Sequence, residues 1–356
     1  MSQPTLREPT LRESTGDPVA DQIVRGVTGV FTQAFPDRIR GCYLRGSYAT
    51  GTRAAGSDLD LFVVFADRFP DDRVEVRRAW AVARSCALIS PILLEIIVVS
   101  EQQLHRPDNH ALALNLKHAT RLLHGQDIRP DLPELQPEAY LRAVIDTPSA
   151  NYAFPVQRRD SPVLTYPLRH LDPEGPFFGF DQWQVPGPDG TDVPSSKLLV
   201  GTVGWTATAI VVLQTGRYVR DKRACVDLYR EHIADQWTDL VAGVHELCRD
   251  RWHYLIPAAE PDRRRLRALC DRALEFQNHF LRRYREFLLA ELRPVAASDR
   301  QLWAARRLGT LQFPDQQVVG ALQQLRTAED QEVRAAAAAA LGTYPPGALD
   351  MRGGAT

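Results

Sequence analysis

The chain has 356 residues, of which 44% are hydrophobic and 24% are charged. This composition excludes collagen, coiled coil and wholesale disorder, and the length allows two or three domains. The formal charge of -1, from 43 basic and 44 acidic side chains, gives no global field that would hold nucleic acid or an anionic membrane. Five scattered cysteines without a C-x-x-C pair indicate neither a disulfide framework nor a thiolate zinc site.

The N-terminal residues 1–16 form a polar arm without the apolar stretch of a signal peptide. The longest apolar run, 198–213, covers about 16 residues and is shorter than the roughly 20 that span a bilayer. We interpret this run as a buried helix. The protein is therefore expected to be cytoplasmic, with no membrane contact.

Residues 17–130 alternate between helical and strand patterns, which predicts a small domain with a mixed sheet. Asp17 and Pro18 are typical of a helix start. The predicted helices and strands, in chain order, are a helix to about residue 35, strands at 42–47 and 58–65, a helix at 70–87, a strand at 91–100, and a helix at 109–125 that ends at a glycine.

The chain after residue 130 changes character twice. Residues 131–191 are rich in proline and aromatics and are interpreted as a linker or insertion, whereas 192–292 has the pattern of an all-α domain. Six aromatic side chains of the middle segment could line an acceptor pocket, but we favour their packing against the two domains: Tyr152, Phe154, Phe177, Phe178, Phe180 and Trp183.

The C-terminal residues 293–356 contain an internal repeat. The tripeptide LGT at 308–310 recurs at 341–343, and an alanine pair recurs at the same offset. The repeat resembles the helical repeats of HEAT proteins, with an ordinary helical hairpin as the alternative. Two repeats are too few to be stable alone, so we expect them to stack on the preceding helices. The predicted fold class is α+β: a small mixed-sheet domain, an all-α domain and a short HEAT-like tail.

Three acidic residues stand in strand context behind a Gly-Ser pair. Asp58 and Asp60 are two positions apart on one strand, which places both on one face about 7 Å apart. Glu95, on the next strand, is expected beside them. Carboxylates converging among apolar neighbours repel one another unless cations lie between them. Magnesium has the matching oxygen preference, and two ions about 4 Å apart can hold both oxygens of a displacement at phosphorus.

Gly46 and Ser47 supply contacts of a second kind. A glycine lets the backbone approach phosphates, and a serine hydroxyl donates a hydrogen bond to them. Together with the three acids they predict a site for a nucleoside triphosphate with magnesium. The alternative treats the aspartates as turn residues and Glu95 as a surface charge on an edge strand, which leaves their spacing and order as coincidences.

The segment GSYATGTRAAGSDLDLFVV resembles the signature of the polymerase-beta-type nucleotidyltransferase superfamily. Within it, LLEIIVVS is similar to the third-strand motif of the streptomycin and spectinomycin adenylyltransferases. The resemblance implies that Asp58 and Asp60 bind magnesium and that Ser47 contacts phosphate. It also implies that Glu95 is the catalytic base, or the third metal ligand as in other members.

A second resemblance lies in LQTGRYVRDKRACVDL, where Lys222 matches a lysine that reaches the nucleotide phosphates in that family. The alternative for Lys222 is an exposed helix face. Arg217, Arg220 and Arg223 add positive charge nearby. The antibiotic-modifying enzymes place acidic residues at the start of the first helix of their helical domain, whereas this chain has Ser195, Ser196 and Lys197 there, with Asp192 nearby. This difference argues against an aminoglycoside acceptor.

The expected function is magnesium-dependent transfer of a nucleoside monophosphate, with AMP favoured, from a triphosphate to a hydroxyl of a small molecule. An aminoglycoside-like sugar and another hydroxylated metabolite are the two candidate acceptors. One alternative is a protein-adenylylating enzyme whose HEAT-like tail recruits the target. Another is a catalytically silent nucleotide-binding scaffold. An RNA substrate is disfavoured because no basic face with interleaved aromatics is evident.

Overall fold

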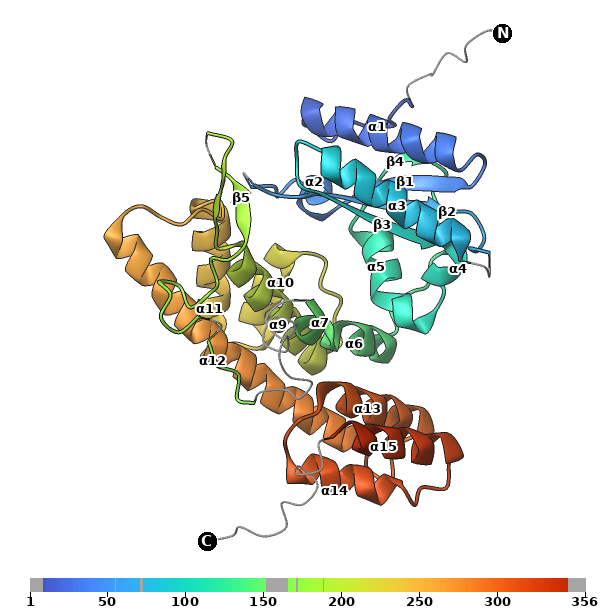
Figure 1. Cartoon of the computed structure of the whole chain (residues 1–356), viewed down its shortest axis with the longest axis vertical. Coiled ribbons are helices and arrows are strands. Elements are labelled where there is room, and N and C mark those ends of the chain that lie inside the picture. The colour runs from blue at the N-terminus through green and yellow to red at the C-terminus, as the bar shows by residue number, and fades with distance from the viewer. Residues whose placement is uncertain are drawn as a thin grey trace.

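The computed structural model describes residues 9–54, 56–70, 73–151, 166–170, 172–187 and 189–344. Two of the aromatic residues considered above, Tyr152 and Phe154, lie outside the described residues. A four-stranded sheet with flanking helices occupies the N-terminal part, and helices form the remainder (Figure 1). The α+β architecture predicted from the sequence is confirmed.

The sheet is mixed, with strand order β3-β2-β1-β4. Strand β1 runs antiparallel to both β2 and β4, and β2 runs parallel to β3. The strands and the helices of this domain have these bounds: β1 Ile39–Arg45, β2 Leu59–Phe65, β3 Leu94–Ser100, β4 Arg121–Gly125, α1 Pro18–Ala34, α2 Gly46–Thr50, α3 Val74–Ile89, α4 Glu101–Leu104 and α5 His110–His118, with short 3-10 turns at Pro107–Asn109 and Arg129–Asp131.

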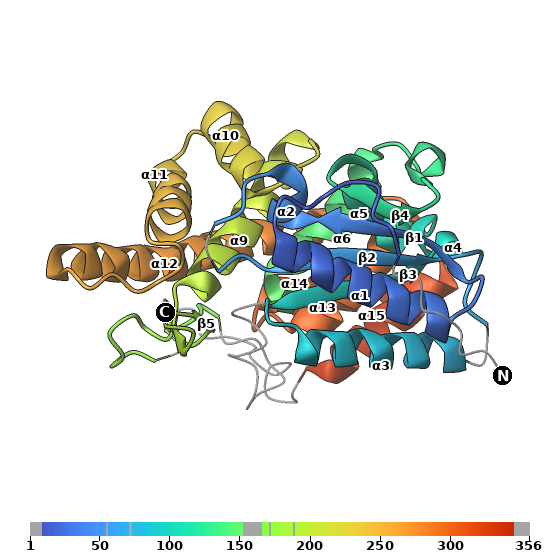
Figure 2. The same cartoon turned by 90° about the horizontal axis from the view of Figure 1, so that it is seen from above.

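Alternation along the strands buries both faces of the sheet. Leu61 and Val63 of β2 pack with α1 and α3 on one face, and Phe62 and Val64 pack with α5 on the other. Figure 2 shows this sheet beside the helical region, with α2 at the end of the sheet nearest to it. Because Asp58 and Asp60 have the same parity as Phe62, they lie on the α5 face, beyond the part that α5 covers.

The prediction of one helix over 109–125 is wrong. Helix α5 ends at His118, and Arg121–Gly125 forms β4, which pairs with β1. Gly125 does not cap a helix: its φ is +86°, and a Cβ there would lie 2.3 Å from the carbonyl oxygen of Arg40. Leu122 and Leu123 are buried on opposite faces of the sheet, as alternating side chains of a strand are. Both are buried because the segment pairs with β1 inside the sheet. The strand predicted over 42–47 is shifted: β1 begins earlier, at Ile39, and ends at Arg45, since Gly46 and Ser47 already belong to α2.

The described part of the N-terminal arm follows the edge of β4. The amide of Arg12 donates to the carbonyl of Leu123 at 2.9 Å, and Glu13 pairs with Arg121 at 2.7 Å. Asp17 caps α1 by accepting from the amides of Val19 and Ala20. The arm thus covers backbone groups that an edge strand would otherwise expose.

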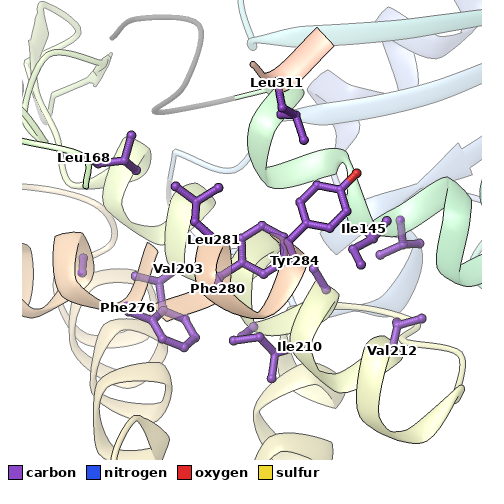
Figure 3. Packing of buried hydrophobic residues seen from close by; sticks show 14 of the residues in the cluster. Ile145, Leu168, Val203, Ile210, Val212, Phe276, Phe280, Leu281, Tyr284 and Leu311 are labelled. Atoms are coloured by element: carbon purple, nitrogen blue, oxygen red, sulfur yellow. The ribbon is translucent and has the colours of Figure 1, made fainter. Parts of the chain in front are cut away.

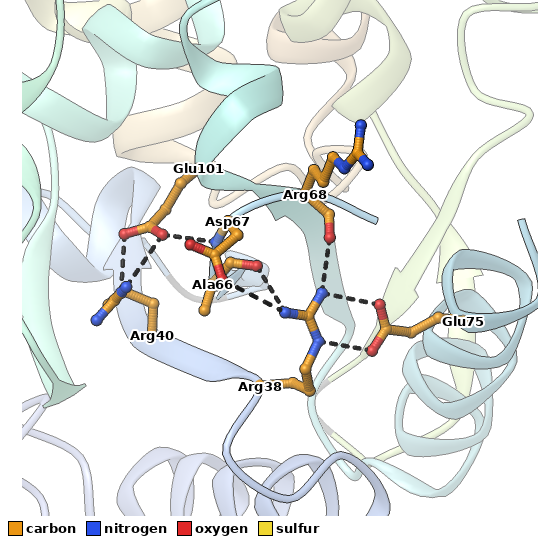
Figure 4. A network of polar contacts seen from close by, with 7 residues as sticks. All are labelled: Arg38, Arg40, Ala66, Asp67, Arg68, Glu75 and Glu101. Carbon is orange, nitrogen blue, oxygen red and sulfur yellow. Dashed lines mark hydrogen bonds and ion pairs between the residues drawn. The ribbon is translucent and has the colours of Figure 1, made fainter. Parts of the chain in front are cut away.

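A network of arginines and acids joins the strands to their loops at the end of the sheet away from α2 (Figure 4). Arg38 makes a bidentate contact with Glu75, at 2.8 and 3.0 Å, and donates to the carbonyl of Arg68 at 2.7 Å. Arg40 pairs with Glu101 at 2.8 Å. The contact with Glu75 raises the pKa of Arg38. These contacts fix the loops at that end of the sheet, opposite the end where Asp58 and Asp60 lie.

The helical region is built around α9. Its helices have these bounds: α6 Pro137–Ile145, α7 Thr147–Asn151, α9 Lys197–Thr215, α10 Lys222–His232, α11 Thr238–Gly243, the π-helix η3 Val244–Arg251 and α12 Glu260–Glu291. Ile210 of α9 packs near Phe276 and Phe280 of α12 in the shared core (Figure 3). Among the described residues α9 is the one helix long and apolar enough to cross a membrane, but its central place in this core accounts for its hydrophobicity. The buried helix predicted for 198–213 is confirmed.

The middle segment contributes to the helical core. Helices α6 and α7 contact α9, and a short hairpin of β5 (Gln184–Pro186) and β6 (Asp192–Pro194) precedes it. Phe177 and Phe180 are buried in the same core, whereas Phe178 stacks beneath Arg267 at 4.0 Å. Packing, the role favoured for these aromatics, is confirmed for the three phenylalanines, while Trp183 is 39% exposed.

The tail forms α13 (Ser298–Leu311), α14 (Gln316–Leu325) and α15 (Gln331–Thr343). The repeated segments pack on each other: a Cβ at Gly309 would lie 2.9 Å from Cα of Ala340, and the Thr343 hydroxyl donates to the Gly309 carbonyl at 3.0 Å. Arg307 pairs with the buried Asp146 at 2.8 Å. The tail therefore stacks on the preceding helices, as expected, and shares their hydrophobic core.

Candidate active site

The backbone of Gly46 lies so close to the side chain of Asp60 that only glycine fits at position 46. Gly46 follows β1 with φ of +67°, and a Cβ at this position would lie 2.2 Å from the Asp60 carboxylate. Only glycine combines this left-handed conformation with the space that the carboxylate occupies. The glycine of the Gly-Ser pair thus positions an acidic side chain, a role that the sequence did not predict.

Arg45, Asp60 and Glu95 form a row across three adjacent strands. Arg45 is the Cα partner of Asp60 in the β1–β2 ladder, and Asp60 is the partner of Glu95 in the β2–β3 ladder. Directly opposed residues point to the same face of a sheet. Arg45 approaches Glu95 to 3.9 Å and stacks over Phe62. The structure therefore brings Asp60 and Glu95 together as predicted and adds an arginine on the other side of Asp60.

The surroundings of the Asp60 carboxyl shift its pKa. Burial, opposed by Arg45 and reinforced by Glu95 and Asp58, raises the pKa of Asp60 to about 7. The neighbouring carboxylates disfavour its ionised form, while the Arg45 guanidinium favours it. An added cation at this point would relieve the repulsion.

Asp58 lies just before β2 and contacts the helical region. Its carboxylate accepts from the ammonium of Lys197, the first residue of α9, and Lys197 also donates to the carbonyl of Gly56 at 3.4 Å. Lys197 is only 11% exposed. Arg249 of η3 donates to the carbonyl of Thr52 in the same loop. The loop between α2 and β2 is thus held by cations from the helical region.

Lys222 begins α10, where Asp221 caps the helix by accepting from the amide of Ala224. Its side chain is accessible to solvent, yet the protein that surrounds the ammonium desolvates it and lowers its pKa. Asp58 and Asp60 raise this pKa and are thus close enough to act on the ammonium. Lys222 therefore lies near the two aspartates, and its contact with nucleotide phosphates stays a prediction.

The acidic residues fit a metal that is shared with a substrate. No three His, Cys, Asp or Glu side chains in the described ranges are arranged as a metal cage. Magnesium, however, is usually held by one or two carboxylates together with substrate phosphates. Asp58 and Asp60 supply oxygen ligands of this kind, and burial, with Glu95 and Asp58 nearby, raises the pKa of Asp60, so that a bound cation would favour its ionised form. These two residues fit such an ion, whereas Glu95 pairs with Arg45 and is half exposed.

The other residues singled out in the sequence differ in their placement. Ser47 is half-buried in the first turn of α2, and its carbonyl accepts from the amide of Thr52 at 3.0 Å. Arg220 pairs with Asp221, and Arg223 lies 3.7 Å from Asp227, so both are engaged locally. Asp192 is exposed on β6.

Three site residues were not recognised as such: Arg45, Lys197 and Arg249. Arg45 directly precedes the Gly-Ser pair, and strand pairing with Asp60 could have indicated it. Lys197 is one of only three lysines in the sequence, and this rarity could have indicated it as a candidate site residue. Arg249 had none, because it is one of many arginines and only the fold brings it to the loop.

Comparison with known proteins finds one family profile and one structural neighbour. Residues 29–112 match the sequence profile of the nucleotidyltransferase domain. A spectinomycin adenyltransferase from Enterococcus faecialis, solved with ATP and spectinomycin, is a structural neighbour with 13% identity and a TM-score of 0.40, covering 72% of this chain and 98% of its own. No curated protein matches the sequence. The matched segment contains Gly46, Asp60 and Glu95, so residues 29–112 of this chain form a nucleotidyltransferase domain.

Proposed function

We propose that this protein transfers a nucleoside monophosphate, with AMP favoured, from a triphosphate to a hydroxyl of a small molecule and releases pyrophosphate. The observation that supports this most is the apposition of Asp60 and Glu95 on one sheet face, with Asp58 beside them and two lysines opposite. Nucleotidyl transfer depends mainly on positioning and neutralising charge. A face with both acids and cations supplies these functions.

The residues divide the work by their charge. Asp58 and Asp60 would hold magnesium, which neutralises charge on the phosphates when bound. Lys222 orients the phosphates from the helical region, and Ser47 contacts them from α2. Arg45 keeps the carboxylates of Asp60 and Glu95 in place through its position in the ladder.

Glu95 has the geometry of a general base. Its side chain is 58% exposed, and its neighbour Asp60 is the more buried of the two, so an acceptor hydroxyl reaches Glu95 first. In this step Glu95 takes the hydroxyl proton, the oxygen bonds to the α-phosphorus, and the bond to the pyrophosphate breaks. As a third metal ligand, Glu95 would instead be needed for metal binding, and Glu95→Gln separates the two roles. If Glu95 is the base, Glu95→Gln retains magnesium-dependent ATP binding; if Glu95 is a metal ligand, the variant loses it.

The proposed function is tested with α-labelled ATP, magnesium and a metabolite extract, with Asp60→Asn beside the wild type. Label should enter a small product only with the wild type. The matched control is Asp67→Asn, because Asp67 is exposed at the other end of the sheet. Magnesium-dependent ATP binding without transfer would instead favour a nucleotide-binding scaffold, and absence of binding would exclude the triphosphate site.

A protein acceptor recruited by the tail is the second candidate, because α13 and α15 border a groove of about 630 Å³ lined by alanines and Arg306. Deleting the tail would not test it, since these helices share the main core. Ala339→Arg places a charge in the groove without touching the active site. Loss of label in protein bands, with small-molecule transfer unchanged, would support this alternative.

A further inference from the structure

We propose that the acceptor is a small hydroxyl compound that carries negative charge, as a carboxylate or a phosphate, and that Lys197 is the residue that selects it. This inference rests on the proposed function and names its substrate class. It follows from the charges that the helical region presents to the loop between α2 and β2. Three elements of that region each contribute one cation there: Lys197 of α9, Lys222 of α10 and Arg249 of η3.

Lys197 is the most constrained of these cations. It is 11% exposed, it contacts Asp58, and its ammonium lies 5.8 Å from the ring centre of Tyr254. The preceding Ser196 anchors the start of α9, because its amide and hydroxyl both donate to the Tyr254 carbonyl. The ammonium is therefore delivered from a rigid helix start, and it cannot simply move away into solvent.

The Asp58 carboxylate cannot fully neutralise the Lys197 ammonium and a metal ion at the same time. When a cation neutralises Asp58, the nearly buried ammonium of Lys197 loses its main counter-charge, and an unpaired buried charge is costly. A new anion near Lys197 offsets that cost. Because Lys222 is the residue placed for the triphosphate, the remaining source of an anion is the acceptor.

Asp221 and Asp250, the carboxylates next to Lys222 and Arg249 in the sequence, are already engaged, whereas Asp192 is exposed on β6. Asp221 caps α10 and pairs with Arg220 at 2.9 Å. Asp250 pairs with Arg249 at 2.8 Å and lies 3.2 Å from the ring of His245. A polycationic acceptor would meet ammonium and guanidinium groups there, and like charges in contact oppose binding.

Arg249 gives independent support for an anion. It is 6% exposed, and although its terminal nitrogens bond to Thr52 and Asp250, its Nε is buried without a partner among the described residues. A buried donor of this kind ordinarily has a partner. An anionic group bound between Arg249 and Lys197 would supply one.

The test uses three hexoses with the same ring and different charge: glucosamine, glucose and glucose 6-phosphate. Each is titrated calorimetrically into the protein with magnesium and the α,β-methylene analogue of ATP, which blocks transfer. Glucose 6-phosphate should bind at least tenfold more tightly than glucosamine, and Lys197→Gln should abolish that preference while the analogue still binds. Lys117→Gln is the matched control, because Lys117 bonds to Glu134 and the Leu132 carbonyl, away from the site.

Equal binding of the three sugars, tighter binding of glucosamine, or a preference that survives in Lys197→Gln would overturn the inference. A metabolite extract separated by charge gives the second readout, with label from ATP expected in the anionic pool. Label confined to the cationic pool would refute the anionic acceptor and leave nucleotidyl transfer intact. Label in no pool, despite bound ATP, would refute the transfer reaction itself.

Discussion

Replacing Gly46 by alanine tests how the backbone positions the Asp60 carboxylate. The new Cβ would lie 2.2 Å from the Asp60 oxygen, well short of the 3.0 Å that real Cβ atoms keep, so the carboxylate must shift by about 1 Å. The φ of +67° adds about 1 to 2 kcal/mol of backbone strain. A displacement of about 1 Å at a catalytic group can reduce the rate by roughly 100-fold.

Gly51→Ala separates strain from collision. Gly51 ends the same short helix with φ of +72°, but no atom lies within 4 Å of its missing Cβ. Both variants should lose similar unfolding free energy in urea from backbone strain, by about 1 to 2 kcal/mol. Only Gly46→Ala should also lose label transfer, by roughly 100-fold. Equal activity of the two variants would refute the argument that Gly46 exists to make room for Asp60.

Three further outcomes are expected. Burial raises the pKa of Asp60 to about 7, so ionising this carboxyl lowers the free energy of unfolding as pH rises from about 4 to 7. Without metal, Asp60→Asn should therefore unfold at a higher urea concentration than wild type at pH 8, but not at pH 4. A wild-type advantage at pH 8 would contradict this. Lys222→Gln should raise the KM for ATP about tenfold, the worth of one charged hydrogen bond, whereas Lys117→Gln should not. Arg307→Met should cost about 3 kcal/mol of unfolding free energy at neutral pH, because Asp146 loses its counter-charge and keeps only the hydrogen bond from the Tyr284 hydroxyl. The loss should shrink in acid as that carboxyl protonates, and a pH-independent loss would point to packing instead.

The sequence alone identified the acids and their shared face. Asp58 and Asp60 are separated by one residue in an apolar strand, so period-two alternation places both on one side without reference to the rest of the fold. Glu95 was expected beside them because it lies on the next strand along the chain, and consecutive strands are usually neighbours. The N-cap at Asp17 and the buried helix α9 were also local properties, since capping and continuous hydrophobicity are written in adjacent residues.

Tertiary structure decided what local patterns leave open. Residues 121–125 form a strand because β1 offers a partner for their backbone, and that partner lies far away in sequence. The same holds for the site: Arg45 gains its role by pairing with Asp60, and Gly46 by the approach of a carboxylate from another strand. Lys197 reaches Asp58 across 139 residues of chain. Contacts of that separation arise from packing of whole domains, so no window of sequence specifies them.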